Sequence, residues 1–337
     1  MFARSSGQCV LVTMMSALMM STLMMLTLGA APAPAAEAVK SAVAARVIFA
    51  IPYWIAERKG YFKDEGIDAS LAVGLTSSEI TAQTRAGALQ ITFGGPDATL
   101  IDATKGGSMR IVAGVVRRPP LWLIAKPSIK SFADLRGANI GVLSLTEGSS
   151  QLLLKMARAE GLALGDLKIT AVGGAPARWN LLKAGKIDAG MQPLPLNYEA
   201  EAAGFNDLGW AGKYEPEWQF ITVNASAEWA SRNPKTTIGF IRALLRAQAF
   251  IASDPGEAAQ IAADELKSQV SLTARSLSAA VQLGIFDPRL DVSEIGLQRV
   301  FENMQGEGAI PADRKFDLGQ VFVPDYLRAA QRSLAAK

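Results

Sequence analysis

Hydroxyl side chains at the starts of two expected helices are the residues best suited to hold a small ligand. Thr76, Ser77 and Ser78 form the first group, and Gly148-Ser149-Ser150 forms the second. Each group follows an expected strand and precedes an expected helix, where free backbone N–H groups and the helix dipole stabilise an anion. Ordinary N-capping explains each group equally well. Two such starts, one in each half of the chain, favour a shared polar site.

Other candidate ligand contacts lie at neighbouring strand ends. Gly95 allows close backbone approach and Asp97 is a helix cap or a ligand contact, while the amide of Gln192 both donates and accepts hydrogen bonds. Tyr53 and Trp54 would cover the apolar part of an organic ligand, or pack in the core. Surface arginine is common, so three basic residues are weaker candidates as anion partners: Arg117, Arg118 and Arg178.

The composition argues against catalysis and against nucleic-acid binding. The chain has 337 residues, no histidine and a single cysteine, Cys9, which lies in a segment expected to be removed. Disulfides, thiolate nucleophiles, Cys/His zinc sites and Ser-His-Asp triads are therefore excluded from the mature chain. The net charge is only +3 and no Lys/Arg-rich block occurs. We expect a globular, monomeric binding protein without cofactor or metal.

The first 35 residues have the plan of a secretory signal peptide. Arg4 is followed by an apolar stretch over residues 10–28, and Ala33 and Ala35 fit the small-residue positions before a cut at Ala36. An uncleaved membrane anchor is the alternative, because the apolar run approaches spanning length. Cys9 precedes the apolar run, so it is misplaced for a lipoprotein anchor. We expect export to the periplasm.

The rest of the chain alternates short β-rich runs with amphipathic segments of helical length, which predicts an α/β fold with mostly parallel strands. Strands are expected at 46–51, 67–73, 89–93, 110–116, 121–125, 138–143, 168–172, 188–191 and 218–224. Helices are expected at 52–59, 76–86, 96–105, 149–161, 176–184 and 194–203, and over most of 226–337.

The two halves repeat one local order: a helix, a glycine at its end, a buried strand, a polar turn, then a proline that opens the next helix. We therefore predict two α/β lobes, with residues 36–126 and 219–337 in the first and 127–218 in the second. Ligands of open α/β sheets bind at the carboxyl ends of the strands. The candidate residues all follow strands, which predicts a ligand cleft between the lobes.

Four segments carry a resemblance to a known family. They are "IPYWIAERKGYFKDEGID" (51–68), "ITFGGPDATL" (91–100), "SFADLRGANIGVLSLTEGSS" (131–150) and "LLKAGKIDAGMQPLP" (181–195). In this order they resemble periplasmic binding proteins for aliphatic sulfonates, taurine, nitrate and thiamine-pyrimidine precursors. The resemblance implies a type II periplasmic-binding-protein fold, with two α/β lobes joined by two crossing strands and closing over a ligand. It also implies an ABC permease and its ATPase as partners.

Carried over by position, the family's ligand contacts fall on the residues already singled out: Tyr53, Trp54, Thr76, Ser77, Ser78, Gly95, Asp97, Gly148, Ser149, Ser150 and Gln192. A basic partner for an oxyanion, frequent in the family, has no clear counterpart here, so the ligand type stays open. Our main hypothesis is capture of a small organic anion that is sulfonate-, taurine-, nitrate- or carboxylate-like. A neutral or heteroaromatic ligand, a cofactor-biosynthesis enzyme on the same fold, and a sensory protein are the alternatives.

Overall fold

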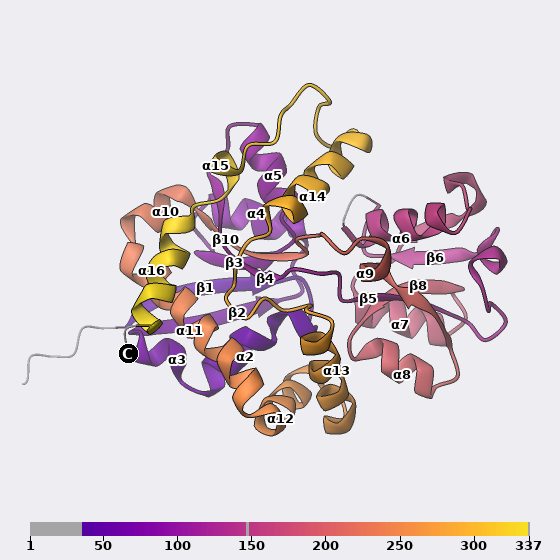
Figure 1. Cartoon of the computed structure of the whole chain (residues 1–337), viewed down its shortest axis with the longest axis horizontal. Helices are drawn as coiled ribbons and strands as arrows, with labels where there is room; N and C mark the ends of the chain where they lie inside the picture. Colours follow the sequence, from indigo (N-terminus) through magenta and orange to yellow (C-terminus); the bar gives the residue numbers. More distant parts are fainter. Residues whose placement is uncertain (1–35, 146–147, 336–337) are drawn as a thin grey trace, which may run out of the picture. The chain divides into compact units, whose positions relative to one another are not determined.

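The described part of the structure, a computed structural model, comprises residues 36–145 and 148–335. The expected signal peptide lies outside these residues. Two lobes are present, each built on its own β-structure (Figure 1). None of the helices within the described ranges is both long enough and apolar enough to span a membrane.

Lobe 1 contains two small sheets. The first pairs β1 (Glu37–Val43) with β2 (Ile67–Val73) in parallel, and the second has the order β3-β10-β4, from Ile91–Gly94, Ile221–Ser226 and Met109–Val116. The lobe's helices are η1 (Ile48–Ala50), α2 (Ile51–Arg58), α3 (Tyr61–Asp64), α4 (Ser77–Arg85), α5 (Asp97–Thr104), α10 (Ala227–Arg232), α11 (Pro234–Ser253), α12 (Pro255–Leu266), α13 (Val270–Gln282), α14 (Glu294–Gly306), α15 (Leu318–Val321) and α16 (Pro324–Ala335).

Lobe 2 contains one five-stranded sheet of order β7-β6-β8-β5-β9. Its strands are β5 (Leu121–Ala125), β6 (Asn139–Val142), β7 (Lys168–Ala171), β8 (Ala189–Pro193) and β9 (Asn206–Trp210). Its helices are η2 (Phe132–Leu135), α6 (Gly148–Ala159), η3 (Leu164–Asp166), α7 (Ala175–Lys183), α8 (Leu196–Ala202) and α9 (Ala211–Tyr214). Leu123, Ile140 and Met191 from three of the strands are fully buried in its core.

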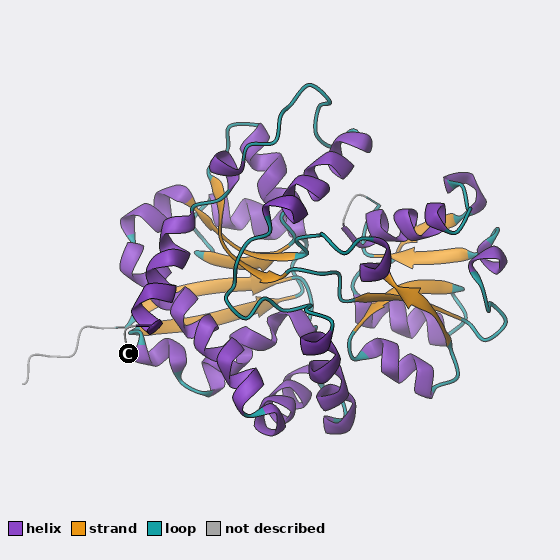
Figure 2. Cartoon of the chain, in the orientation of Figure 1, coloured by secondary structure: helices purple, strands orange, loops and turns teal. Residues whose placement is uncertain are grey.

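Two segments cross between the lobes, 117–120 from β4 to β5 and 215–220 from α9 to β10 (Figures 1 and 2). The strand that follows each crossing enters its lobe from the cleft side, whereas its neighbours run toward the cleft. Both β5 and β10 therefore pair antiparallel with the strands on either side. The expectation of mostly parallel strands is wrong for this reason, while the α/β fold with two lobes is confirmed.

The first predicted strand is also wrong. Residues 46–51 form a turn, the 3₁₀ helix η1 and the start of α2, and the first strand is β1 instead. A short apolar run such as 47–51 suits a buried helix as well as a buried strand, and Pro52 in the first turn of α2 fixes the helical outcome. No strand was predicted at the position of β9, because its sequence, Asn206-Asp207-Leu208-Gly209-Trp210, lacks β-branched residues.

The lobe boundaries predicted from the sequence remain predictions. Strand β5 precedes the predicted boundary at 126–127. It nevertheless belongs to the sheet of lobe 2, since it pairs with β8 and β9.

Candidate functional site

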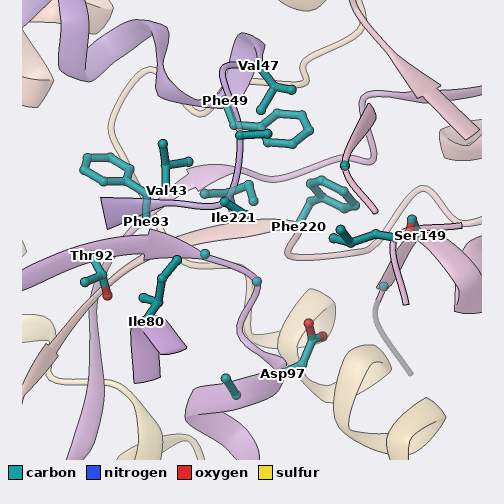
Figure 3. A pocket seen from close by; sticks show the side chains of 18 of the residues that line it. Val43, Val47, Phe49, Ile80, Thr92, Phe93, Asp97, Ser149, Phe220 and Ile221 are labelled. Carbon is teal, nitrogen blue, oxygen red and sulfur yellow. The ribbon is translucent and has the colours of Figure 1, made fainter. Parts of the chain in front are cut away.

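A cavity of about 130 Å³ lies where the carboxyl ends of strands from both lobes converge. Its walls are mainly apolar, and Phe49 and Phe220 meet edge to face across 5.2 Å between ring centroids. In Figure 3 the oxygens of Ser149, Asp97 and Thr92 stand among side chains made otherwise of carbon. The apolar lining includes Val43, Val47, Ile80, Phe93, Trp218 and Ile221.

The start of α6 supplies the most ligand-like polar group. Gly148 and Ser149 line the cavity, and Ser149 is only 8% exposed. Its Oγ is buried and has no hydrogen-bond partner within the described residues. A buried hydroxyl without a partner is costly, so its presence beside a cavity points to a missing ligand atom. Trp218 lies close by, with its Nε1 at 3.7 Å from the position that a Cβ on Gly148 would occupy.

The start of α7 also reaches the cavity, and two buried side chains hold it there. Gly174, the N-cap residue, offers no side-chain cap, so the first backbone N–H groups of α7 are not capped by a side chain. Arg178 donates from Nε and Nη2 to the carbonyl of Met191, at 3.0 and 2.6 Å, and thereby ties α7 to β8. The amide of Gln192 lies 3.2 Å from the Ala175 carbonyl and 3.3 Å from the Trp179 nitrogen. Both side chains position α7, and Gln192 itself does not line the cavity.

On the lobe 1 side, Gly95 and Asp97 line the cavity at the start of α5. A Cβ on Gly95 would come within 2.6 Å of Asp97 Oδ2, so a larger residue at this position would require the carboxylate to move. Below them, Asn224 Oδ1 accepts hydrogen bonds from Thr99 at 3.1 Å and Thr222 at 2.9 Å. Asp97 is the one carboxylate among the described residues that line the cavity.

Thr76, which caps the start of α4, does not line the cavity. This residue is exposed and closes a capping box with Glu79, whose backbone N–H it accepts at 3.2 Å. The Glu79 carboxylate accepts in return from the Thr76 backbone N–H and hydroxyl, at 2.7 and 2.8 Å, and these bonds lower the pKa of Glu79. Ser77 and Ser78 are the first residues of α4. The α4 residues that line the cavity are Ile80 and Thr81.

Tyr53 and Trp54 lie in the lobe 1 core and do not line the cavity. The Tyr53 ring packs against Phe62, Phe93 and Phe240, with ring centroids 5.0, 5.8 and 6.2 Å away. Burial raises the pKa of Tyr53. Trp54 is 2% exposed, and the Arg46 guanidinium lies 5.8 Å from its ring centroid.

Among the residues whose side chains the structure describes, five of the sequence candidates line the cavity: Gly95, Asp97, Gly148, Ser149 and Arg178. Ser150, one residue further into α6, is buried and donates its hydroxyl to the carbonyl of Ser144. Phe49, Phe220 and Trp218 were not expected at the site, because an apolar residue in a cavity wall has the same sequence pattern as one in the core. Trp218 and Phe220 lie within the crossing segment 215–220.

The lobes contact each other through two further pairs of elements. Between α8 and the α12–α13 region, Ser268 Oγ donates to Glu199 at 2.9 Å and the Arg275 guanidinium lies 3.6 Å from the Tyr198 ring centroid. Gln151 of α6 donates to Glu307 after α14 at 3.1 Å. These contacts brace the two lobes around the cavity.

A family model described as NMT1/THI5 like matches residues 49–258, more than half of the chain. A candidate binding protein of Brucella abortus is 29% identical over 66% of this chain and 71% of that protein. The 4-amino-5-hydroxymethyl-2-methylpyrimidine phosphate synthase THI5 of Saccharomyces cerevisiae is 22% identical over 62% of this chain and 65% of that enzyme.

Solved structures of periplasmic binding proteins share the fold. The nitrate-binding protein NrtA of Synechocystis superposes with a TM-score of 0.74 at 16% identity, over 90% of this chain and 91% of that one. The alkanesulfonate-binding protein SsuA of Xanthomonas axonopodis, bound to MOPS, superposes with a TM-score of 0.71 at 14% identity, over 87% of this chain and all of that one.

Proposed function

From the premise that this chain belongs to the NMT1/THI5-like family, we propose that it is a non-catalytic solute-binding protein that captures a small organic anion. In this proposal it works as a monomer in the periplasm, after export through its N-terminal signal, and delivers the anion to an ABC-type permease driven by an ATPase. The binding proteins of the same fold for nitrate and alkanesulfonate support this role.

The observation that carries the proposal is the buried, unpartnered hydroxyl of Ser149 at the start of α6. An anion held there would accept from this hydroxyl and from backbone N–H groups of the first turn, in the field of the helix dipole. The start of α7, also on the cavity, adds a second set of N–H groups without a side-chain cap. Such a site needs no charged side chain, although Arg178, whose Nε and Nη2 donate to the Met191 carbonyl, also lines the cavity.

The cavity walls favour an anion with an apolar body over a bare inorganic ion. Phe49, Phe220 and Trp218 present aromatic surface, and Val43 and Val47 present aliphatic surface. Such walls gain free energy from burying carbon and gain nothing from nitrate. An organic sulfonate or carboxylate therefore fits better than nitrate.

A heteroaromatic ligand is a second candidate, because the cavity presents aromatic rings and the yeast relative is named for pyrimidine chemistry. In this version Phe49 and Phe220 would flank the ring, since Tyr53 and Trp54 lie outside the cavity lining. If the protein converted such a ligand into a product, it would be an enzyme and not a binding protein. We favour binding, because the sequence has no histidine and its single cysteine is Cys9.

The test is a thermal-shift screen of residues 36–337 with nitrate, taurine, alkanesulfonates, aromatic carboxylates and pyrimidines. A ligand at about a thousand times its dissociation constant adds roughly 4 kcal/mol, which shifts Tm by about 2–4 °C per kcal/mol. The proposal expects the largest shift from an organic anion. A Tm shift only with pyrimidines would favour a heteroaromatic ligand. No Tm shift with any of the anions would contradict the proposal of an organic anion.

A further inference from the structure

A second cavity, of about 380 Å³, lies in lobe 1 and shares no lining residue with the cleft cavity. Its walls come from the residues after β4, from the second half of α11 and from the end of α13 and the chain that follows. Apolar side chains form most of the surface, among them Ile251, Leu283 and Phe286.

The polar groups of this cavity are basic or neutral. Arg117 and Arg118 line it, and the described residues of its lining include no carboxylate. Arg117 donates from Nη1 to Asp287 Oδ2 at 3.2 Å, and the other Asp287 oxygen accepts the backbone N–H groups of Arg289 and Asp291, at 2.9 and 3.0 Å. The Asp287 carboxylate therefore offsets the positive charge of Arg117 and not that of Arg118. Arg118 donates from Nη1 to the Leu283 carbonyl at 3.2 Å, a neutral acceptor, and it forms no ion pair within the described residues.

The side chain of Gln248 is a second indication, independent of Arg118, that this cavity binds a ligand. This residue lines the cavity from α11, is 5% exposed, and its Nε2 is buried without a hydrogen-bond partner in the described part of the chain. Buried polar groups nearly always have partners. An acceptor atom that enters the cavity would satisfy this N–H, and a negatively charged acceptor would also meet Arg118.

We propose that this cavity is a second binding site, for a small organic acid whose anionic head meets Arg118 and Gln248 and whose apolar body packs on Ile251, Leu283 and Phe286. The site adjoins a crossing segment, because the Arg117 N–H donates to the Ile285 carbonyl at 2.8 Å and Phe286 bridges to Val116. An acid bound there contacts the chain that links the lobes without entering the cleft. The proposal holds whatever ligand the cleft takes.

The experiment titrates the protein with 4-fluorobenzoate and with 4-fluorobenzyl alcohol, its neutral analogue, and follows the ¹⁹F signal of each probe. We expect saturable binding of the acid, and binding of the alcohol at least tenfold weaker. Arg118→Leu should raise the Kd for the acid at least tenfold, and Gln248→Leu at least threefold. Arg118→Lys, which keeps the charge, should stay within threefold of the parent protein.

Two control measurements distinguish binding in this cavity from binding in the cleft and from a loss of folding. Ser149→Ala, which alters only the cleft, should leave the acid's Kd in the second site unchanged. Gln248→Leu should melt no lower than the parent in the absence of probe, since it removes a buried Nε2 that has no partner among the described residues. Absence of saturable binding, equal binding of the alcohol, an unchanged Kd in Arg118→Leu, or loss of binding in Ser149→Ala would each overturn the proposal.

Discussion

The starts of α4 and α6 look alike in sequence and differ in the folded protein. Thr76-Ser77-Ser78 and Gly148-Ser149-Ser150 each place hydroxyls between a strand and a helix. At α4, Thr76 is exposed and its hydroxyl is fully engaged in a capping box with Glu79. At α6, Ser149 is buried at the cleft cavity and its hydroxyl has no partner among the described residues.

The same residue types therefore leave a hydroxyl donor available for a ligand only where no side chain of the protein binds it and burial excludes water. The Glu79 carboxylate accepts the hydrogen bonds of the Thr76 backbone N–H and hydroxyl, so these donors at the start of α4 are satisfied within the protein. Helix α6 begins at Gly148, so Ser149 lies inside its first turn, and the residue in the position of Glu79 is Ser150, which has no carboxylate. Ser149 Oγ, which has no partner among the described residues, is the donor that the proposed function assigns to an external anion.

The sharpest way to break the comparison is to place a carboxylate in the cleft. Ser149→Asp would put a negative charge at the start of α6, where it would satisfy the helix internally and repel an anionic ligand. We expect the ligand's Kd to rise more than about 100-fold, because like charges brought together cost several kcal/mol. Calorimetric titration measures this, and binding of an anion with unchanged affinity would contradict the account.

Removal of the hydroxyl alone should have a smaller effect. Ser149→Ala deletes one donor to the anion, and a hydrogen bond to a charged group is worth about 1.5–3 kcal/mol, so we expect a Kd increase of at least about tenfold. Ser150→Ala is the matched control, since this hydroxyl is bonded to the Ser144 carbonyl and does not line the cavity. Equal loss of affinity in both variants would show that the effect is structural.

The corresponding change at α4 should affect stability and not affinity. Thr76→Ala removes an N-cap hydroxyl, which costs about 1 kcal/mol of free energy of unfolding. Thermal or denaturant unfolding measures the loss, and the ligand titration should be unchanged. A raised Kd in this variant would mean that α4 takes part in binding after all.

The smallest expected effect is a pH dependence of the α4 cap. Hydrogen bonds from Thr76 hold the pKa of Glu79 below its ordinary value of 4.5. The cap therefore stabilises the protein fully above that pH and loses its contribution as the pH falls through the lowered pKa of Glu79. The stability difference between the parent protein and Thr76→Ala should shrink below about pH 4. A difference that stays constant from pH 7 to pH 3 would rule out this coupling.

Local patterns in the sequence predicted most elements: β5 is an apolar run, β2 contains alternating residues, and prolines mark the starts of α5 and α7. They failed where two structures satisfy the same pattern. The apolar run 47–51 suits a strand or a helix, and in the structure it leads into η1 and the start of α2. Likewise Tyr53 follows an expected strand but belongs to an aromatic core, and Phe220 faces a cavity that no local pattern reveals.

The most direct test of the central claim is a crystal structure of the protein with the anion that gives the largest thermal shift. We predict that an oxygen of the anionic group accepts a hydrogen bond from Ser149 Oγ and from a backbone N–H of the first turn of α6, with the apolar body against Phe49 and Phe220. An anionic group bound at the start of α4, or away from Ser149, would contradict the account.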